Sequence, residues 1–170
     1  IDREAPIRVR NTFNPSDPGT LIQPQAQITS GAVKAITIIR DVSLISVEGR
    51  GMVGVPGVAG RTFMAVARLG VSILLISQAS SEQSFCFIVP SDRTTQVLDA
   101  IRKELRVELE RRDVDRVWAR EDIVIITAVG AGMRGTPGVA ARVTGALASR
   151  TINILVIAQG SSEYSISLVV

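Results

Sequence analysis

The sequence contains no histidine, a single cysteine and few aromatic residues. The absence of histidine excludes the Ser-His-Asp and Cys-His catalytic systems and removes the commonest zinc ligand. Aromatic residues make up only 4% of the chain, so it lacks the stacking platforms that bind single-stranded nucleic acid. The net charge of +3 comes from arginines scattered along the chain, so nucleic acid is not an expected partner.

Long hydrophobic runs are also missing. Apolar runs such as residues 73–76 and 123–126 are far shorter than the roughly 20 residues that cross a membrane, and no signal-peptide pattern opens the chain. With 46% hydrophobic and 21% charged residues, the composition is that of a globular protein, which we expect to be cytoplasmic and free of membranes. One cysteine excludes an internal disulfide, and Cys86, between Phe85 and Phe87, is expected to be a buried thiol in a strand.

A duplication is the strongest pattern that is present. The glycine-rich segment 49–59 recurs at 130–140, and the same offset of 81 residues pairs Gln78 with Gln159 without a gap. Segments 80–82 and 161–163 both read Ser-Ser-Glu. Such self-similarity predicts two copies of one supersecondary unit.

The first copy has the hydrophobic periodicity of an α+β domain. Its predicted elements are a strand at 42–47, a helix that begins at Pro56 and ends at Gly70, strands at 71–78 and 84–89, a helix after Pro90 capped by Ser91 or Asp92, and a strand at 114–119. This order predicts a ferredoxin-like βαββαβ fold, in which an antiparallel sheet carries both helices on one face.

The second copy is shorter than the first. It begins near Ile123 and reaches Val170 after its third strand. The apolar segment 33–39 precedes the first copy and can supply the missing strand, which would make the first domain an insertion in the second. The predicted domains are a lead-in at 1–32, a strand at 33–40 that completes the second domain, a first domain at 41–121, and a second domain at 122–170 without its C-terminal helix.

Both glycine-rich segments match the G-x-G-x-x-G pattern of dinucleotide-binding loops. That fold also needs an acidic residue about 20 positions later, yet residues 51–81 and 131–162 contain neither Asp nor Glu, so a nucleotide-dependent enzyme is disfavoured. A loop of small residues before a helix can instead present backbone N–H groups to an anion such as a carboxylate. A tight turn without a ligand remains the alternative.

Gln78 and Gln159 place amide groups in otherwise apolar strands. A buried amide needs a hydrogen-bonding partner, which a polar ligand between neighbouring domains would supply. The alternative is a surface or edge-pairing role. Asn153 presents the same choice, and its counterpart in the first copy is Ser72.

The strand, the glycine-rich loop and the Pro-Gly-Val-Ala helix start resemble ACT domains, in the tandem form typical of aspartate kinases. Residues 53–59 and 75–82 are similar to the first ACT domain of that family, and residues 157–163 to the second. Residues 6–22 resemble the end of the kinase catalytic domain. The resemblance covers nearly the whole chain.

The resemblance implies a regulatory module that is itself inactive. A catalytic domain before residue 1 would handle aspartate, ATP and Mg²⁺, and this chain would provide feedback control by an end-product amino acid. Threonine or lysine is implied, with a slight preference for threonine because of the paired Gln residues. The resemblance also implies a homodimer formed through the ACT domains and no cofactor within this chain.

In the family, the effector lies between the loop before the first helix and the second strand. Carried over residue by residue, the effector-binding positions are Met52, Val53, Gly54, Val55, Pro56, Gly57, Val58, Ser72, Ile76 and Gln78 in the first copy, and Met133, Gly135, Pro137, Gly138, Asn153 and Gln159 in the second. Backbone N–H groups of residues 54–58 are expected to hold the effector's carboxylate, and Gln78 or Asn153 its ammonium group or side chain. Many relatives have Asn where this chain has Ser72. A dimerisation module without a ligand, and an ACT regulator of another amino-acid enzyme, remain alternatives.

Overall fold

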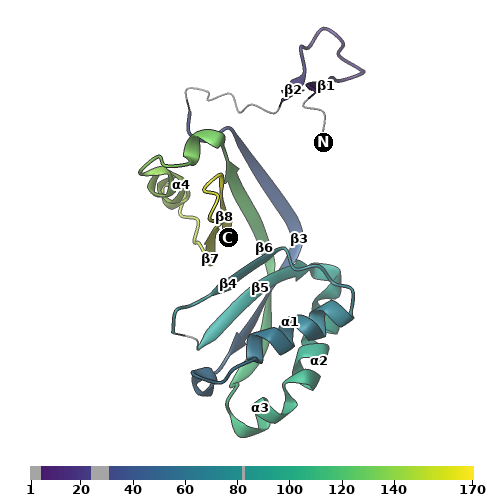
Figure 1. The fold of residues 1–170 in the computed structure, drawn as a ribbon, viewed down its shortest axis with the longest axis vertical. Coiled ribbons are helices and arrows are strands. Elements are labelled where there is room, and N and C mark those ends of the chain that lie inside the picture. The colour runs from purple at the N-terminus through teal and green to yellow at the C-terminus, as the bar shows by residue number, and fades with distance from the viewer. Residues whose placement is uncertain (1–4, 24–30, 82) are drawn as a thin grey trace.

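The computed structural model describes residues 5–23, 31–81 and 83–170, and its main feature is a six-stranded antiparallel sheet with the strand order β4-β5-β3-β6-β8-β7. A separate hairpin of β1 and β2 lies apart from this sheet near the N-terminus (Figure 1). The strands are β1 (Ile7–Val9), β2 (Thr20–Ile22), β3 (Ala35–Glu48), β4 (Leu75–Gln78), β5 (Ser84–Pro90), β6 (Arg116–Val129), β7 (Val156–Gln159) and β8 (Ser165–Val169). The helices are α1 (Val58–Arg68), α2 (Thr94–Glu104), α3 (Arg106–Arg111) and α4 (Val139–Ala148). The predicted α+β class, with ferredoxin-like antiparallel sheets and helices, is confirmed.

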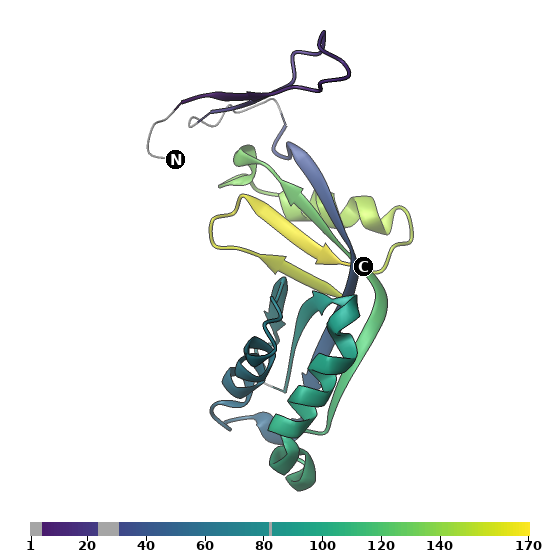
Figure 2. The same ribbon diagram turned by 90° about the vertical axis from the view of Figure 1, so that its right-hand side faces the viewer.

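Two strands of 14 residues each, β3 and β6, run side by side through the length of the sheet (Figures 1 and 2). Their pairing is interrupted around residues 39–44, where the register shifts. Asp41 and Asp122, which are 81 positions apart, have φ of 57° and 54° at this point. Because a left-handed residue breaks the extended backbone, both long strands bend here.

The bend divides the molecule into a first half, residues 42–120, and a second half, residues 31–39 with 123–170. In the second half, residues 35–39 of β3 pair with residues 125–129 of β6. Residues 116–120 of β6 pair with residues 44–48 of β3 in the first half. Residues 35–39 and 116–120 are themselves 81 positions apart, so each long strand contributes one segment to each half.

The first half has its core between the sheet and two helices. Helices α1 and α2 cover one face, and the side chains that meet there include Ile45, Val66, Phe87, Val97 and Ile101, all 0% exposed. The ring of Phe63 in α1 lies edge-on to Phe85 and Phe87, with centroid distances of 5.7 and 5.6 Å. Burial of each such side chain contributes about 1.5–3 kcal/mol, so this face supplies much of the hydrophobic stabilisation of the first half.

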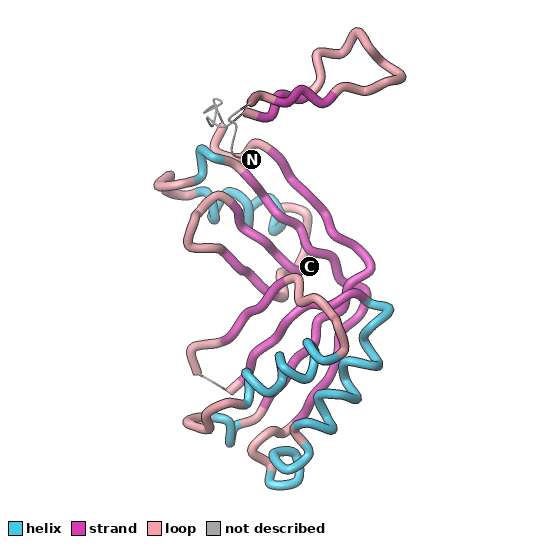
Figure 3. The backbone as a smooth tube through the Cα atoms, turned by 45° about the vertical axis from the view of Figure 1, so that its right-hand side comes forward, coloured by secondary structure: helices cyan, strands magenta, loops and turns pink. Residues whose placement is uncertain are grey.

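A second core joins the helix-free faces of the two halves. It consists of Val42, Leu44, Leu75 and Ile88 from the first half and Ile123, Ile125, Val156 and Val169 from the second, four pairs of residues at the repeat offset. It brings the edge strands β4 and β7 close to each other (Figures 2 and 3). The two halves therefore pack against each other around an approximate twofold relationship.

The second half carries one helix. Val139 at the start of α4 packs with Met133, Ile166 and Leu168, and all of them are 5% exposed or less.

In the part of the chain that the structure describes, no helix is long and apolar enough to cross a membrane.

Several predicted element boundaries were wrong. Helix α1 begins at Val58 instead of Pro56, because Gly57 adopts the left-handed conformation with φ of 91°. Residues 71–74 lie outside β4, since the ladder with β5 begins only at Leu75. Neither Ser91 nor Asp92 caps α2 with its side chain: a 3-10 turn, Ser91–Arg93, precedes the helix.

Candidate effector-binding site

The glycine-rich loops of the two halves are built in the same way. A Cβ atom on Gly49 would lie 2.2 Å from the carbonyl oxygen of Asp113, and one on Gly130 would lie 2.1 Å from that of Ala32. Such distances are far inside van der Waals contact, so these two glycines are required for packing. This supports the turn interpretation for the first glycine of each loop, because the neighbouring backbone occupies the space beside it.

The later glycines of each loop face open space. No atom lies within 4 Å of a Cβ built on Gly54, Gly57, Gly135 or Gly138. All four have φ between 65° and 91°, which other L-residues rarely adopt. The loop therefore turns sharply while leaving its backbone accessible in front of the helix.

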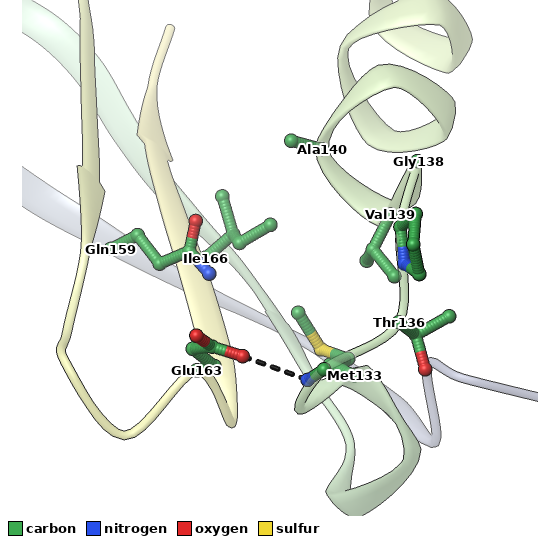
Figure 4. A pocket seen from close by; sticks show the side chains of 10 residues that line it. Met133, Thr136, Gly138, Val139, Ala140, Gln159, Glu163 and Ile166 are labelled. Atoms are coloured by element: carbon green, nitrogen blue, oxygen red, sulfur yellow. Dashed lines mark hydrogen bonds between the residues drawn. The ribbon is translucent and has the colours of Figure 1, made fainter.

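In the second half, this loop borders a cavity of about 290 Å³ (Figure 4). The volume lies just below the range that is usual for small-molecule sites, about 300–1,000 Å³. The cavity is open to solvent on one side and is bordered by the loop, the first turn of α4, the end of β7 and the hairpin that leads into β8. Its lining residues are Met133, Gly135, Thr136, Pro137, Gly138, Val139, Ala140, Gln159, Glu163 and Ile166.

Most of the second-copy residues predicted from the sequence meet at this cavity. Met133, Gly135, Pro137, Gly138 and Gln159 all line it. Gln159 is exposed at the end of β7, so its amide carries no burial cost of the kind considered from the sequence.

Asn153 is the exception among the predicted residues. It is exposed in the segment between α4 and β7 and is not among the described residues that line the cavity. Its assignment to the effector site stays a prediction.

Sequence reasoning missed Thr136, Val139, Ala140, Glu163 and Ile166 as lining residues. The carboxylate Oε2 of Glu163 accepts a hydrogen bond of 2.8 Å from the backbone N–H of Gly135 (Figure 4). Glu163 itself has φ of 58° in the tight turn that follows β7. The repeated Ser-Ser-Glu sequence was the available signal, because it places an acid after each of the two Gln-bearing strands.

The first turn of α4 lies on the opposite side of the cavity from this hairpin. The backbone N–H of Arg142 donates to the carbonyl of Gly138 at 3.1 Å and so forms the first turn of the helix. The N–H groups of Val139 and Ala140 precede that bond, where helix geometry provides no intrahelical acceptor. They give this end of the cavity a partial positive charge.

A cation lies next to the cavity without lining it. Nη1 of Arg134 donates to the Tyr164 hydroxyl at 3.2 Å, and its guanidinium lies 5.9 Å from the centre of that ring. The bond to Tyr164 raises the pKa of Arg134, and Glu163 adds a smaller contribution of the same sign. Arg134 therefore stays charged.

The first half places its predicted residues at equivalent positions. Met52 and Val58 are buried, and the loop between them, which holds Val53, Gly54, Val55, Pro56 and Gly57, is exposed. Ile76 and Gln78 are exposed on the edge strand β4, and Ser72 is exposed between α1 and β4. These assignments also stay predictions.

The described residues contain no group of three or more His, Cys, Asp or Glu side chains that could hold a metal ion. Cys86 in β5 is half-buried, and burial raises the pKa of its thiol. Among the described residues, those predicted to bind the effector come together most closely at the second-half cavity.

The family model for the ACT domain matches residues 45–105 and 126–170 of this chain. The chain belongs to the ACT domain family. Within it, the chain is 30% identical to the regulatory subunit of aspartate kinase from Thermus thermophilus, with a TM-score of 0.66 over 82% of this chain and 88% of that one. The predicted resemblance to the regulatory region of aspartate kinases is thereby confirmed.

Longer relatives match almost the whole chain. It is 42% identical to the bifunctional aspartokinase/homoserine dehydrogenase 1 of Arabidopsis thaliana over 98% of its own length and 19% of the relative's. The aspartate kinase structure from Clostridium acetobutylicum matches 99% of this ACT chain and 39% of its own, with 26% identity and a TM-score of 0.85. This chain thus spans about a fifth of the length of the plant relative.

Proposed function

We propose that this ACT chain is the allosteric module of an aspartate kinase and that it binds an end-product amino acid, threonine or lysine, to inhibit the kinase. The parent enzyme would transfer a phosphoryl group from ATP to aspartate in a catalytic domain N-terminal to this chain, where ATP and Mg²⁺ would bind. The regulatory-subunit match supports the assignment to a kinase. The binding function rests on the second-half cavity, which is lined by the glycine-rich loop, the start of α4 and Gln159.

The proposed regulation acts through the arrangement of domains. An effector shifts an equilibrium only when it binds one arrangement more tightly than another, and such couplings are typically about 1–3 kcal/mol. The cavity lies beside β7, an edge strand of the sheet. A second ACT domain pairing along such an edge would lie next to the bound effector, and the effector would favour that pairing.

A dimerisation module without a ligand is the second candidate. Its support is the apolar surface of the two edge strands, where Ile76 is 50% and Ile157 is 53% exposed. Exposed strand edges are sites of pairing between chains. In this candidate, amino acids would leave the oligomeric state and the melting temperature unchanged.

Titration calorimetry with threonine and with lysine tests the proposal directly. The unmodified chain is expected to bind one of them, and Gln159→Ala is expected to weaken that binding about tenfold by removing a polar contact. Gln78→Ala tests the first half in the same way. Gln96→Ala, on the exposed face of α2, is the matched control and should leave the affinity unchanged.

The two candidates predict different results for the unmodified chain. Light scattering with and without each amino acid reports the assembly state in parallel. No heat of binding, no change in melting temperature and an unchanged dimer would overturn the sensor proposal in favour of the dimerisation module.

A further inference from the structure

The second-half cavity carries a negative charge at one end. Glu163 is the only ionisable side chain among the described residues that line it. Its Oε2 atom is held by the Gly135 N–H, which fixes the carboxylate against the loop. The other oxygen, Oε1, accepts no hydrogen bond from the residues that the structure describes, so it can accept one from a ligand.

This placement changes how an amino acid can lie in the cavity. A ligand carboxylate at the Gly135 N–H would have to displace Glu163 or approach it closely, and two carboxylates a few ångströms apart repel each other. The first turn of α4, on the other side, favours an anion instead. The cavity therefore presents a fixed anion and a helix N-terminus to the two ends of a zwitterion.

We propose that Glu163 binds the ammonium group of the effector and so restricts this cavity to free α-amino acids, whose carboxylate lies at the start of α4. This inference rests on the proposed function. It differs from the contacts expected from the sequence, in which the loop amides hold the carboxylate and an amide side chain can hold the ammonium group. Glu163 is a specificity-determining residue here, because a ligand without an ammonium group cannot form the charge-assisted hydrogen bond with its carboxylate.

The test follows the Gly135 amide by ¹H–¹⁵N NMR of the 170-residue chain, since this resonance reports the second-half cavity separately from the first-half loop. The probes are threonine, lysine and 3-hydroxybutanoate, which is threonine without its amino group. In the unmodified chain, the Gly135 resonance should titrate with threonine or lysine. 3-Hydroxybutanoate should bind about tenfold more weakly than threonine, or weaker still, because a hydrogen bond to a charged group is lost.

The decisive variant is Glu163→Gln, which keeps an oxygen acceptor for the Gly135 N–H and removes only the charge. It should lower the affinity for the amino acid about tenfold or more and leave binding of 3-hydroxybutanoate unchanged or tighter. Glu110→Gln is the matched control, because Glu110 is an exposed acid on α3, and it should behave as the unmodified chain does.

Each other outcome has a separate meaning. Unchanged or tighter amino-acid binding in Glu163→Gln overturns this inference alone, since Glu163 would then be structural or a competitor of the effector's carboxylate. Calorimetric binding without a Gly135 shift also overturns it, while the proposed function survives at the first-half loop. No binding of any amino acid overturns both.

Discussion

The two halves of the molecule descend from one sequence unit but bury it differently. In the first half, Ala65 and Val66 of α1 are 5% and 0% exposed. Their counterparts in α4, Ala146 and Leu147, are exposed and half-exposed. The difference lies in α2, which covers the first sheet face and packs against α1.

The uncovered face of the second half is apolar. A cavity of about 270 Å³ opens on it between β3, β6 and α4. The residues that line it are Val33, Ile36, Ile126, Ala128, Arg142, Val143, Ala146, Leu147 and Leu168. The counterparts of Ile126 and Leu168 are Ile45 and Phe87, which lie fully buried beneath the helices of the first half. Leu168 is as buried as Phe87, but Ile126 is only half-buried where Ile45 is fully buried, because no counterpart of α2 covers this part of the second sheet face.

The largest expected loss of stability comes from truncating Phe87 or its counterpart in the second half, Leu168, which occupy the same position of the sheet. Phe87→Ala should lower the free energy of unfolding by about 3–5 kcal/mol, since Phe87 is 0% exposed and contacts Phe63. Leu168→Ala should cost less, about 2–3 kcal/mol, because Leu168 already borders a cavity. Equilibrium urea unfolding measures both. A cost at Leu168 equal to that at Phe87 would show that the covering helix adds no stability at this position.

The first glycine of each loop should behave differently from the core residues, because its substitution should lower the free energy of unfolding by the same amount in both halves. Gly49→Ala and Gly130→Ala should each cost about 1–3 kcal/mol, because the new Cβ meets a backbone carbonyl at 2.2 and 2.1 Å. Thermal unfolding compares them. Gly60→Ala, with open space around it in α1, is the control and should not destabilise. If Gly130→Ala left the stability unchanged while Gly49→Ala lowered it, the backbone of the second loop would be able to move away from the new Cβ and that of the first would not.

A network at Glu48 occurs only in the first half, since its counterpart is Val129. Partial burial raises the pKa of Glu48, but hydrogen bonds from Arg116, Trp118 and Ser46 outweigh it and bring the pKa below its ordinary value of 4.5. The carboxylate therefore stabilises the fold above pH 4.5, and this stability is lost as the pH falls through the lower folded-state pKa.

Glu48→Gln tests this difference between the halves. It should cost about 1 kcal/mol at neutral pH and make the acid limb of the stability curve shallower. Urea unfolding between pH 3 and 7 measures both effects. Glu110→Gln is again the exposed control, and an acid limb as steep in Glu48→Gln as in the unmodified chain would assign the acid sensitivity to other groups.

The smallest expected effect is a gain. Gly145 lies within α4 with no atom within 4 Å of a built Cβ, so Gly145→Ala should raise the unfolding free energy by about 0.5–1 kcal/mol. Gly60→Ala in α1 should give a similar gain if the halves unfold together. Urea unfolding monitored by circular dichroism decides this. A gain from one variant only would indicate that the halves unfold separately.

The sequence by itself determined the repeat, the fold class and five of the ten residues that line the second-half cavity. An offset of 81 residues is visible without any contact, and glycine, proline and alternating apolar residues act on their own backbone or nearest neighbours. The resemblance to ACT domains placed Gly135, Pro137 and Gln159 at one site, and all three line the cavity. Element ends were less predictable, because the start of α1 depends on the conformation of Gly57.

Only the tertiary structure decided what lies between segments far apart in the chain. The bend at Asp41 and Asp122 and the hydrogen bond from Gly135 to Glu163 depend on residues whose partners no local pattern specifies. Burial was decided at the same level, since a strand residue becomes core only when another element packs on its face, a helix in the case of Ile45 and the other half of the molecule in the case of Leu44. The physical reason is that such contacts depend on the positions of whole elements, while the sequence signals reflect the preferences of each segment alone.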